Sequence, residues 1–259
     1  MTFQNRIKDV DILQEEINKY RPLSPHAVKQ LKEYYRIGLT YTSNAIEGNS
    51  LTETETKIIL EDGITIGGKS IKEHQEAIGH SEAYDLLYTL LKSKTITEKD
   101  IKKLHRIFYY RIDEGNAGEY RKVAVFISGT DYIPPQPEEV PTLMKQLSEQ
   151  ISTIREKYHP VEYSALLHGD FVTIHPFVDG NGRTARLLMN LALLQESYVI
   201  TLIPPILRGE YINTLKDYNK GKTKAFINFI SAMVYESQKD YLRLLEALSG
   251  GKKKAKENK

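Results

Sequence analysis

Apolar residues recur at intervals of three and four along most of the chain, which is the period of an amphipathic helix. One helix is predicted after residue 186, where four leucines share a face before the Pro204-Pro205 pair. Neither an internal repeat nor a linker rich in Pro, Gly or Ser divides the sequence. We therefore expect a mainly helical fold, with the other helices over residues 9–20, 25–45, 54–62, 71–91, 97–112, 140–158, 161–174, 210–218 and 224–248.

Residues 122–135, KVAVFISGTDYIPP, are the one stretch that favours β-structure. A β-branched run precedes a Ser-Gly-Thr-Asp turn signal, and a short return ends in two prolines. A lone hairpin on a helical body leaves at least one edge exposed. Such an edge, at Val125, Ile127 and Ser128, could hold an extended segment of a partner protein by main-chain hydrogen bonds. The alternative is that the hairpin only covers part of the core.

The composition excludes several classes of protein. The chain has 259 residues, of which 40% are hydrophobic and 27% charged, enough for one large domain or one domain with a helical extension. It contains no cysteine, which excludes disulfides, a thiolate zinc site and a cysteine nucleophile. The apolar runs are too short to span a membrane, and residues 1–20 carry acids where a signal peptide needs an apolar stretch. We expect a cytoplasmic protein without membrane association.

The net charge of +2 is concentrated in the last residues. Residues 249–259, SGGKKKAKENK, contain five lysines and one glutamate and so carry +4, which leaves −2 for residues 1–248. A body this close to neutrality lacks the basic surface of a nucleic-acid-binding protein. We expect no nucleic-acid partner and a disordered, solvated tail over residues 249–259.

Residues 63–70, GITIGGKS, match the phosphate-loop pattern G-x-x-x-x-G-K-[ST]. That loop functions between a buried parallel strand and a helix, but the preceding TKIILED is short and no alternation of strands and helices follows. A simpler interpretation is a turn at Gly67 and Gly68, followed by a capping box from Ser70 to Glu73 that starts the next helix. We therefore do not interpret this stretch as a nucleotide site.

The segment HPFVDGNGRTAR, residues 175–186, places two arginines at a predicted helix start. The unpaired N–H groups there are already partly positive, so cations are unfavourable unless an anion is bound. Gly180, Asn181 and Gly182 allow the backbone to direct successive N–H groups into one concavity, as in an anion nest. Arg183 and Arg186 lie three residues apart and can contact the same ligand. The pattern predicts a phosphate site.

Two neighbouring side chains are of the types that would serve as a metal ligand and as a general base at this site. Asp179 offers the type of oxygen ligand that Mg²⁺ uses beside substrate phosphates. His175 is the one nearby side chain whose ordinary pKa suits a general base. The alternative is a plain interhelical turn, with Asn181 as a cap and the arginines solvated. The residues favour a nucleoside triphosphate site over that turn.

The same segment matches the signature of the Fic family, H-P-F-x-[DE]-G-N-G-R-x-x-R, at every fixed position. The resemblance covers about residues 25–248. Residues 122–135, which follow GEYR, resemble the family's flap, and residues 211–219, YINTLKDYN, resemble its adenine-side helix. Known members are mostly helical and transfer AMP from ATP to a hydroxyl of a target protein, with release of pyrophosphate. The resemblance implies a Fic-type helical bundle with a short β-hairpin flap.

The resemblance also implies roles for the catalytic and adenine-side residues. His175 would accept the proton of a Ser, Thr or Tyr hydroxyl that attacks the α-phosphate. Asp179 would hold Mg²⁺, or Mn²⁺ in its place. Tyr211 and Asn219 would contact the adenine, although residues of these types also serve ordinary helix packing.

Within the nest, each residue would contact one phosphate of ATP. Asn181 would bind the α-phosphate, and the backbone of Gly180 and Gly182, together with Arg183, would bind the β-phosphate. Arg186 would reach the γ-phosphate. The implied partners are ATP, a target protein docked on the flap and the enzyme itself as a target; a homodimer is left open.

Residues 43–48, SNAIEG, match the inhibitory motif of the family, [ST]-x-x-x-E-[GN], with Ser43, Glu47 and Gly48 at its fixed positions. In the family this glutamate pairs with the second arginine of the signature, here Arg186, and we expect a bidentate contact that excludes the γ-phosphate. The resemblance implies an N-terminal helical region at 1–60 with an inhibitory helix at about 25–48, and a catalytic core at 61–248. The alternative is a plain helix end capped by Gly48.

Other functions stay open at this point. A transferase of the same fold could move UMP, phosphate or phosphocholine, or could mainly remove AMP through water activated by Glu47. A module that binds nucleotide without turnover is a third hypothesis. The intact GNGR favours adenylyl transfer, and the intact His175 argues against a non-catalytic module. The remaining histidines have no partner at metal-ligand spacing and are interpreted as surface or structural residues: His26, His74, His80, His105, His159 and His168.

Overall fold

The computed structural model describes residues 3–93, 95–127 and 129–249, and within these ranges the regular structure is helical. The predicted mainly helical fold is thereby confirmed. The elements in chain order are α1 (Ile7–Asn18), α2 (Pro25–Ile46), α3 (Glu53–Lys57), the π-helical turn η1 (Ile58–Asp62), α4 (Ile71–Leu90), α5 (Glu98–Tyr109), α6 (Val140–Lys157), α7 (Pro160–Ile174), α8 (Asn181–Gln195), the 3₁₀ turn η2 (Pro205–Leu207), α9 (Arg208–Tyr218) and α10 (Thr223–Leu248).

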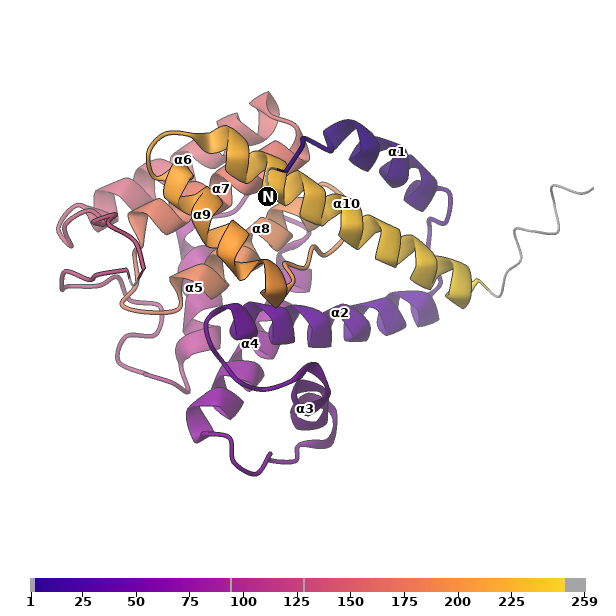
Figure 1. The fold of residues 1–259 in the computed structure, drawn as a ribbon, viewed down its shortest axis with the longest axis horizontal. Helices are drawn as coiled ribbons and strands as arrows, with labels where there is room; N and C mark the ends of the chain where they lie inside the picture. The colour runs from indigo at the N-terminus through magenta and orange to yellow at the C-terminus, as the bar shows by residue number, and fades with distance from the viewer. Residues whose placement is uncertain (1–2, 94, 128, 250–259) are drawn as a thin grey trace, which may run out of the picture.

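Helix α8 lies at the centre of the molecule (Figure 1). Almost every side chain from Asn181 to Leu193 is buried, because α7 packs along one side of α8 and α4 and α5 contact others. Leu187, Leu188 and Leu191 belong to one apolar core, whereas Met189 and Leu193 belong to a second core with α9 and α10. A helix enclosed on all sides is held in one position, which matters because the signature arginines lie in its first turns.

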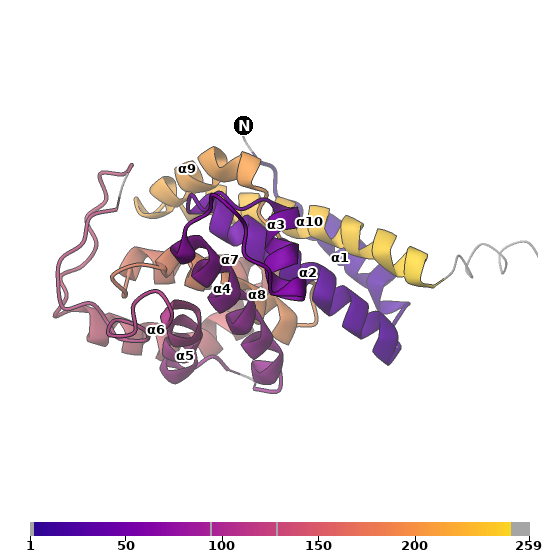
Figure 2. The ribbon, with the colours of Figure 1, turned by 90° about the horizontal axis from the view of Figure 1, so that it is seen from below.

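The long helices α2 and α10 extend to the same side of the molecule (Figures 1 and 2). Helix α2 begins with Ser24, whose hydroxyl accepts the N–H of Ala27, and with Pro25 in the first turn. It packs against α4 and ends directly over the start of α8. The end of α2 therefore lies at the predicted nucleotide site.

The sequence interpretation of residues 63–70 is confirmed. They lie between η1 and α4, without a preceding strand in the described chain. Gly68 has a left-handed φ of 79°, and Ser70 and Glu73 form a capping box at the start of α4. None of the described helices has the length and apolar character of a membrane span.

The predicted hairpin over residues 122–135 is not formed in its described part, which contains no strand and extends from the body as a loop (Figure 2). Arg121 holds both ends of this loop, by donating to the carbonyls of Val123 at 3.2 Å and of Pro135 at 2.5 Å. Pro134 and Pro135 have no N–H to donate to a strand ladder. Of the predicted docking residues, Val125 and Ile127 are half-buried, and Ser128 lies outside the described residues, as do positions 250–259 of the predicted tail.

Candidate active site

The loop from His175 to Gly180 connects the end of α7 to the start of α8. His175 has a φ of 52°, a left-handed conformation that is uncommon for a residue with a side chain, and Gly180 has a φ of 77°. No side chain of the described residues caps the first turn of α8. The N–H groups of this helix start are therefore available to an anion, as the sequence pattern predicts.

Asn181 fixes this loop, and its side chain differs from the expectation. Its amide accepts the N–H of Phe177 at 2.9 Å and donates to the carbonyl of Phe177 at 2.8 Å, and the residue is only 2% exposed. We expected Asn181 to bind the α-phosphate, and in the structure both polar atoms of its side chain bond inside the loop. What Asn181 presents to a ligand is its backbone N–H.

His105 of α5 packs against the same loop. Its ring stacks on Phe177 with centroids 3.7 Å apart, and its Nδ1 accepts the N–H of Gly118 at 2.9 Å. Burial lowers the pKa of His105 to about 4, so the ring is neutral and Nε2 carries the proton. That nitrogen donates to the carbonyl of Asp179 at 3.1 Å. The sequence marked His105 only as structural, because no local pattern signals a contact with residue 179.

His175 is half-buried and electrically neutral at neutral pH. Burial lowers the pKa of its imidazole to about 4, against a smaller opposite effect of the Val172 carbonyl. Its own backbone carbonyl accepts the Nε–H of Arg121 at 2.8 Å, which ties the base of the loop at residues 122–135, here called the flap loop, to the turn at His175. A neutral imidazole at this position can accept a proton.

Glu47 and Arg186 are in direct contact at the end of α2. Nη2 of Arg186 donates to Oε1 of Glu47 at 2.7 Å and to the carbonyl of Ser43 at 2.8 Å, and Nε donates to the Ser43 hydroxyl at 2.9 Å. The carboxylate thus contacts the guanidinium through one oxygen, not in the expected bidentate manner.

Two glycines allow this approach of the two helices. A Cβ on residue 182 would collide with Glu47, so Gly182 is required for the contact. Gly48 follows with a φ of 96°, as expected for a left-handed helix end.

The charges of this pair stabilise each other. Burial by itself raises the pKa of the Glu47 carboxyl, but the adjacent Arg186 outweighs it, and the net pKa lies below the ordinary value. Burial likewise lowers the pKa of Arg186, and Tyr211 with Glu47 raises it above the ordinary value. Both groups are therefore ionised throughout the physiological range.

Tyr211 does not lie at the cavity where we expected it to contact adenine. It is 1% exposed in the second apolar core, and its hydroxyl accepts Nη1–H of Arg186 at 3.2 Å. The same hydroxyl lies 2.9 Å from Nε2 of His168. Because this face of α9 is turned towards the core, Tyr211 hydrogen-bonds to Arg186 from within the core.

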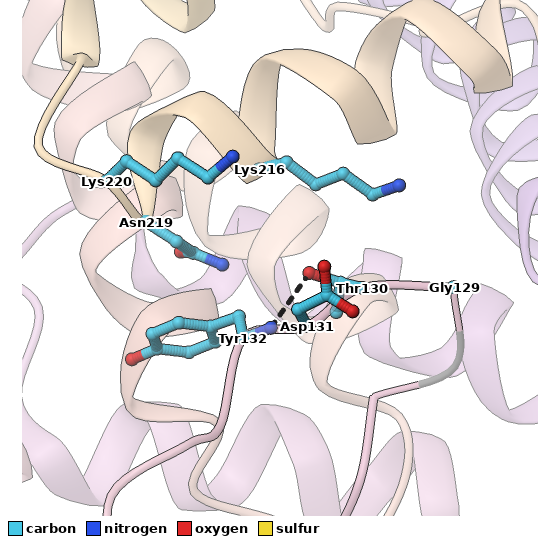
Figure 3. A pocket seen from close by; sticks show the side chains of 7 residues that line it. All are labelled: Gly129, Thr130, Asp131, Tyr132, Lys216, Asn219 and Lys220. Atoms are coloured by element: carbon cyan, nitrogen blue, oxygen red, sulfur yellow. Dashed lines mark hydrogen bonds between the residues drawn. The ribbon is translucent and has the colours of Figure 1, made fainter.

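Asn219 does line a cavity, of about 310 Å³, between α9 and the flap loop (Figure 3). Its Oδ1 accepts the hydroxyl hydrogen of Thr173 at 2.9 Å, and its amide nitrogen points towards the space above Tyr132. Tyr132 in turn donates to the carbonyl of Thr173 at 3.0 Å. The other lining residues are Gly129, Thr130, Asp131, Lys216 and Lys220.

Asp179 meets the requirements of a magnesium ligand. Its side chain is 47% exposed; Oδ1 accepts the N–H of Gly180 at 2.6 Å and Oδ2 lies 3.4 Å from the Tyr109 hydroxyl. The described residues contain no cluster of three or more metal-ligating side chains. A single open carboxylate fits Mg²⁺, which keeps several waters and binds substrate phosphates in addition to one or two carboxylates.

Arg183 is nearly enclosed, with its side chain 4% exposed and its guanidinium 4.7 Å from the ring centre of Phe108. Its Nη1 lies 2.8 Å from Oε1 of Glu76 in α4, and its Nη2 lies 3.5 Å from Oδ1 of Asp179. Nε and Nη1 are both buried without a hydrogen-bond partner in the described chain, so the contact of Nη1 with Glu76 is an ion pair and not a hydrogen bond. The sequence did not indicate Glu76, since a glutamate on an amphipathic helix gives no signal of burial.

Comparisons with known proteins agree with this geometry. A model of the Fic/DOC family matches residues 95–193. The protein adenylyltransferase Fic of Drosophila erecta is 38% identical over 234 residues, which cover 88% of this chain and 46% of the relative. That of Drosophila willistoni is 39% identical over 207 residues, covering 79% and 41%. The chain thus spans less than half the length of these curated relatives.

Solved structures show the same fold over most of the chain. Fic-1 of C. elegans (residues 134–508) is 31% identical with a TM-score of 0.83, and the match covers 95% of this chain and 72% of that one. A Fic domain containing signaling protein from Bacteroides thetaiotaomicron is 28% identical with a TM-score of 0.84, covering 93% and 97%. With this identity over nearly the whole chain and the complete signature at the start of α8, the protein belongs to the Fic/DOC family.

Proposed function

We propose that this protein is an adenylyltransferase that transfers AMP from ATP to a hydroxyl of a target protein. The observation that carries the proposal is the meeting of three groups at the start of α8: free N–H groups, two buried arginines and a neutral histidine. This combination supplies anion binding and a proton acceptor at one place. The relatives named protein adenylyltransferase support the same activity.

ATP would bind with its phosphates along the α8 start. The N–H groups of Asn181 and Gly182, next to Gly180, would receive the α- and β-phosphates, because they have no capping side chain. The unpartnered Nε of Arg183 would donate to the β-phosphate, and Arg186 would contact the γ-phosphate. Asn219 would meet the adenine in the cavity beside the flap loop.

In the transfer step, the target hydroxyl oxygen forms a bond to the α-phosphorus, and the bond from that phosphorus to the bridging oxygen of the β-phosphate breaks. His175 accepts the hydroxyl proton, and pyrophosphate leaves. Asp179 would hold Mg²⁺, which would supply stabilisation of the charge that develops on the phosphates. The arginines and the helix start contribute by position and charge, which dominate catalysis of this type.

We further propose that Glu47 inhibits this transfer. The Arg186 guanidinium donates to Ser43 and Tyr211, which orient it, and its Nη2 donates to Glu47, which occupies the donor that a γ-phosphate needs. One guanidinium cannot serve the carboxylate and a phosphate together. ATP would therefore bind with its γ-phosphate displaced, and the α-phosphate would not reach the position for attack.

The target segment would dock on the flap loop. Although the described part of the loop contains no strand, Phe126 is 89% exposed and Ile133 68% exposed, and apolar side chains this exposed favour contact with a partner. An extended target segment beside Val125, Ile127 and Ser128 would bind by main-chain hydrogen bonds. Arg121 would fix the loop relative to His175, since it bonds the loop ends and the His175 carbonyl.

One contact favours a second activity, the removal of AMP from a modified protein. Only Oε1 of Glu47 bonds to Arg186, and Oε2 has no hydrogen-bond partner among the described residues. A free carboxylate oxygen at this position could activate a water molecule for hydrolysis of the AMP–protein bond. Release of AMP from labelled protein by the wild type, and not by Glu47→Gly, would show it.

Labelled ATP tests the main proposal. The wild type, Glu47→Gly and His175→Ala are each incubated with Mg²⁺ and with α-labelled or γ-labelled ATP, and labelling of the protein itself is followed on gels. Adenylyl transfer predicts label from α-labelled ATP alone, strongest in Glu47→Gly and lost in His175→Ala. Label from γ-labelled ATP would instead indicate phosphate transfer, and no label in any variant would leave a nucleotide-binding module.

A further inference from the structure

Glu76 lies buried in α4, 6% exposed, at the point where α4 meets the start of α8. Its Oε1 pairs with Nη1 of Arg183 at 2.8 Å. Its Oε2 accepts the side-chain N–H of Asn49 at 2.9 Å. The two oxygens of one buried carboxylate thus connect the first signature arginine to the segment that follows the inhibitory helix.

The buried guanidinium of Arg183 has this carboxylate as its nearest counterion. A buried guanidinium without a counterion is strongly unfavourable. The other nearby acid, Asp179, lies further away at 3.5 Å and its side chain is half exposed, where water weakens its attraction. Glu76, with a side chain 9% exposed, is therefore the main counterion of Arg183.

The carboxylate itself is held in one orientation. Asn49 donates to Oε2 and also to the backbone carbonyl of Glu73, and Asn44 donates to the carbonyl of Glu76 at 3.4 Å. Lys72 lies 4.0 Å from Oε1 but is 60% exposed and adds little. A carboxylate fixed in this way can fix the arginine that it binds.

Two contacts consequently hold the guanidinium of Arg183 in position. Glu76 holds Nη1, and the ring of Phe108 lies against the guanidinium carbon at 4.7 Å. Nη1 is held by the ion pair alone, without a hydrogen bond, and the unpartnered Nε and the weakly engaged Nη2 are left for a ligand. A rigid arginine loses less entropy on binding a phosphate than a mobile one.

We propose that Glu76 is a positioning residue that holds Arg183 for the β-phosphate of the nucleotide. This inference rests on the proposed function, in which Arg183 binds that phosphate. Glu76 does not touch the nucleotide and acts only through the arginine. Because AMP lacks a β-phosphate, the effect of Glu76 appears in the binding of ADP and not in that of AMP.

Calorimetry with ADP and AMP, at constant Mg²⁺, tests the inference. Neither nucleotide has a γ-phosphate, so the contact between Glu47 and Arg186 does not enter the comparison. Glu76→Gln keeps the size of the side chain and removes its charge, and it should raise the ratio Kd(ADP)/Kd(AMP) about 5- to 20-fold. Glu76→Asp keeps the charge but moves it away from Arg183, so it should raise the ratio by a smaller factor. This variant keeps the inference testable if Glu76→Gln does not fold.

Two further variants complete the experiment. Glu73→Gln is the matched control on the same helix: Glu73 bonds to Ser50 and Ser70, not to Arg183, and glutamine also suits a capping box, so the ratio should stay within twofold of the wild type. Arg183→Ala should raise the ratio, and adding Glu76→Gln to it should change the ratio no further, because both act through one contact.

The outcomes separate this inference from the proposed function. If Arg183→Ala raises the ratio but neither Glu76 variant does, Glu76 has no positioning role and the phosphate assignment stands. If Glu73→Gln raises the ratio as much as Glu76→Gln, the effect is a general one of α4 and the inference is wrong. If Arg183→Ala leaves the ratio unchanged, the β-phosphate assignment fails and the inference fails with it.

Discussion

Nη2 of Arg186 lies 2.7 Å from Oε1 of Glu47, although 139 residues separate the two in the sequence. The contact is part of a set in which Ser43 accepts two hydrogen bonds from the same guanidinium and Tyr211 accepts one. The last turn of α2 is also held by Arg208, which donates to the carbonyl of Ile46 at 2.6 Å. The end of α2 thus occupies donors of this arginine, while the packing of α8 in the core fixes its position.

Glu47→Gly should activate self-labelling with AMP by roughly 30- to 1000-fold. The substitution removes the carboxylate and leaves Ser43 and Tyr211 to orient Arg186, so the guanidinium becomes available to the γ-phosphate. A partly desolvated charge pair of this kind holds back ~2–4 kcal/mol. Initial rates of incorporation from α-labelled ATP measure the change, and a rate within about twofold of the wild type would contradict inhibition by Glu47.

Arg186→Ala should not activate, although it also breaks the contact with Glu47. It removes the group that binds the γ-phosphate together with the inhibitory contact. The double variant Glu47→Gly/Arg186→Ala should therefore be as inactive as Arg186→Ala alone. A double variant as active as Glu47→Gly would show that Arg186 has no part in ATP binding.

His175→Ala, in the Glu47→Gly background, should lower the labelling rate by on the order of 10²–10⁴-fold, which is the typical contribution of a general base. The pH profile of kcat/KM in Glu47→Gly checks the same residue. Burial lowers the pKa of His175 from 6.5 to about 4, and protonation inactivates a base. Activity should then stay level from pH 7 to 5 and fall only below that, whereas an acid limb near pH 6.5 would indicate a solvent-exposed base.

Asp179→Ala should reduce metal-dependent turnover more than nucleotide binding, because the metal stabilises charge during transfer. Turnover is measured in the Glu47→Gly background over a range of Mg²⁺ concentrations, and ATP binding by calorimetry. A right-shifted Mg²⁺ dependence with a nearly unchanged Kd supports the assignment. Full activity of Glu47→Gly in the presence of a chelator would exclude it.

His105→Ala should destabilise the fold by about 3 kcal/mol or more. The substitution leaves a cavity against Phe177 and removes two buried hydrogen bonds, to Gly118 and to the Asp179 carbonyl. Urea unfolding followed by circular dichroism gives the free energy of unfolding. His26→Ala, at an exposed position of α2, is the control and should stay within ±0.5 kcal/mol of the wild type.

The sequence predicted the helices because their apolar spacing is a local property. The capping box of Ser70 and Glu73 was predicted for the same reason. The hairpin at 122–135 was predicted wrongly in its described part: a β-branched run favours an extended chain, but pairing also needs a partner edge, and Arg121 holds the loop ends instead. Local preference by itself therefore could not predict whether this segment pairs.

The burial of side chains could not be predicted. A tyrosine in YINTLKDYN can face either a ligand or the core, and only the packing of α9 against α10 places Tyr211 inside. Asn181 was expected to bind phosphate, yet the tight turn before α8 brings the backbone of Phe177 within reach of its amide. Glu76 and His105 were missed because their partners, Arg183 and Asp179, lie about 107 and 74 residues away in the chain.

By itself the sequence determined the helical class and the family, because each depends on residues close together in the chain. Tertiary structure alone decided which donors of the two arginines are occupied and by which carboxylates. Hydrogen bonds and ion pairs need groups within about 3 Å and in a defined orientation. Only the packing of α2 and α4 against α8 brings Glu47 and Glu76 to that distance.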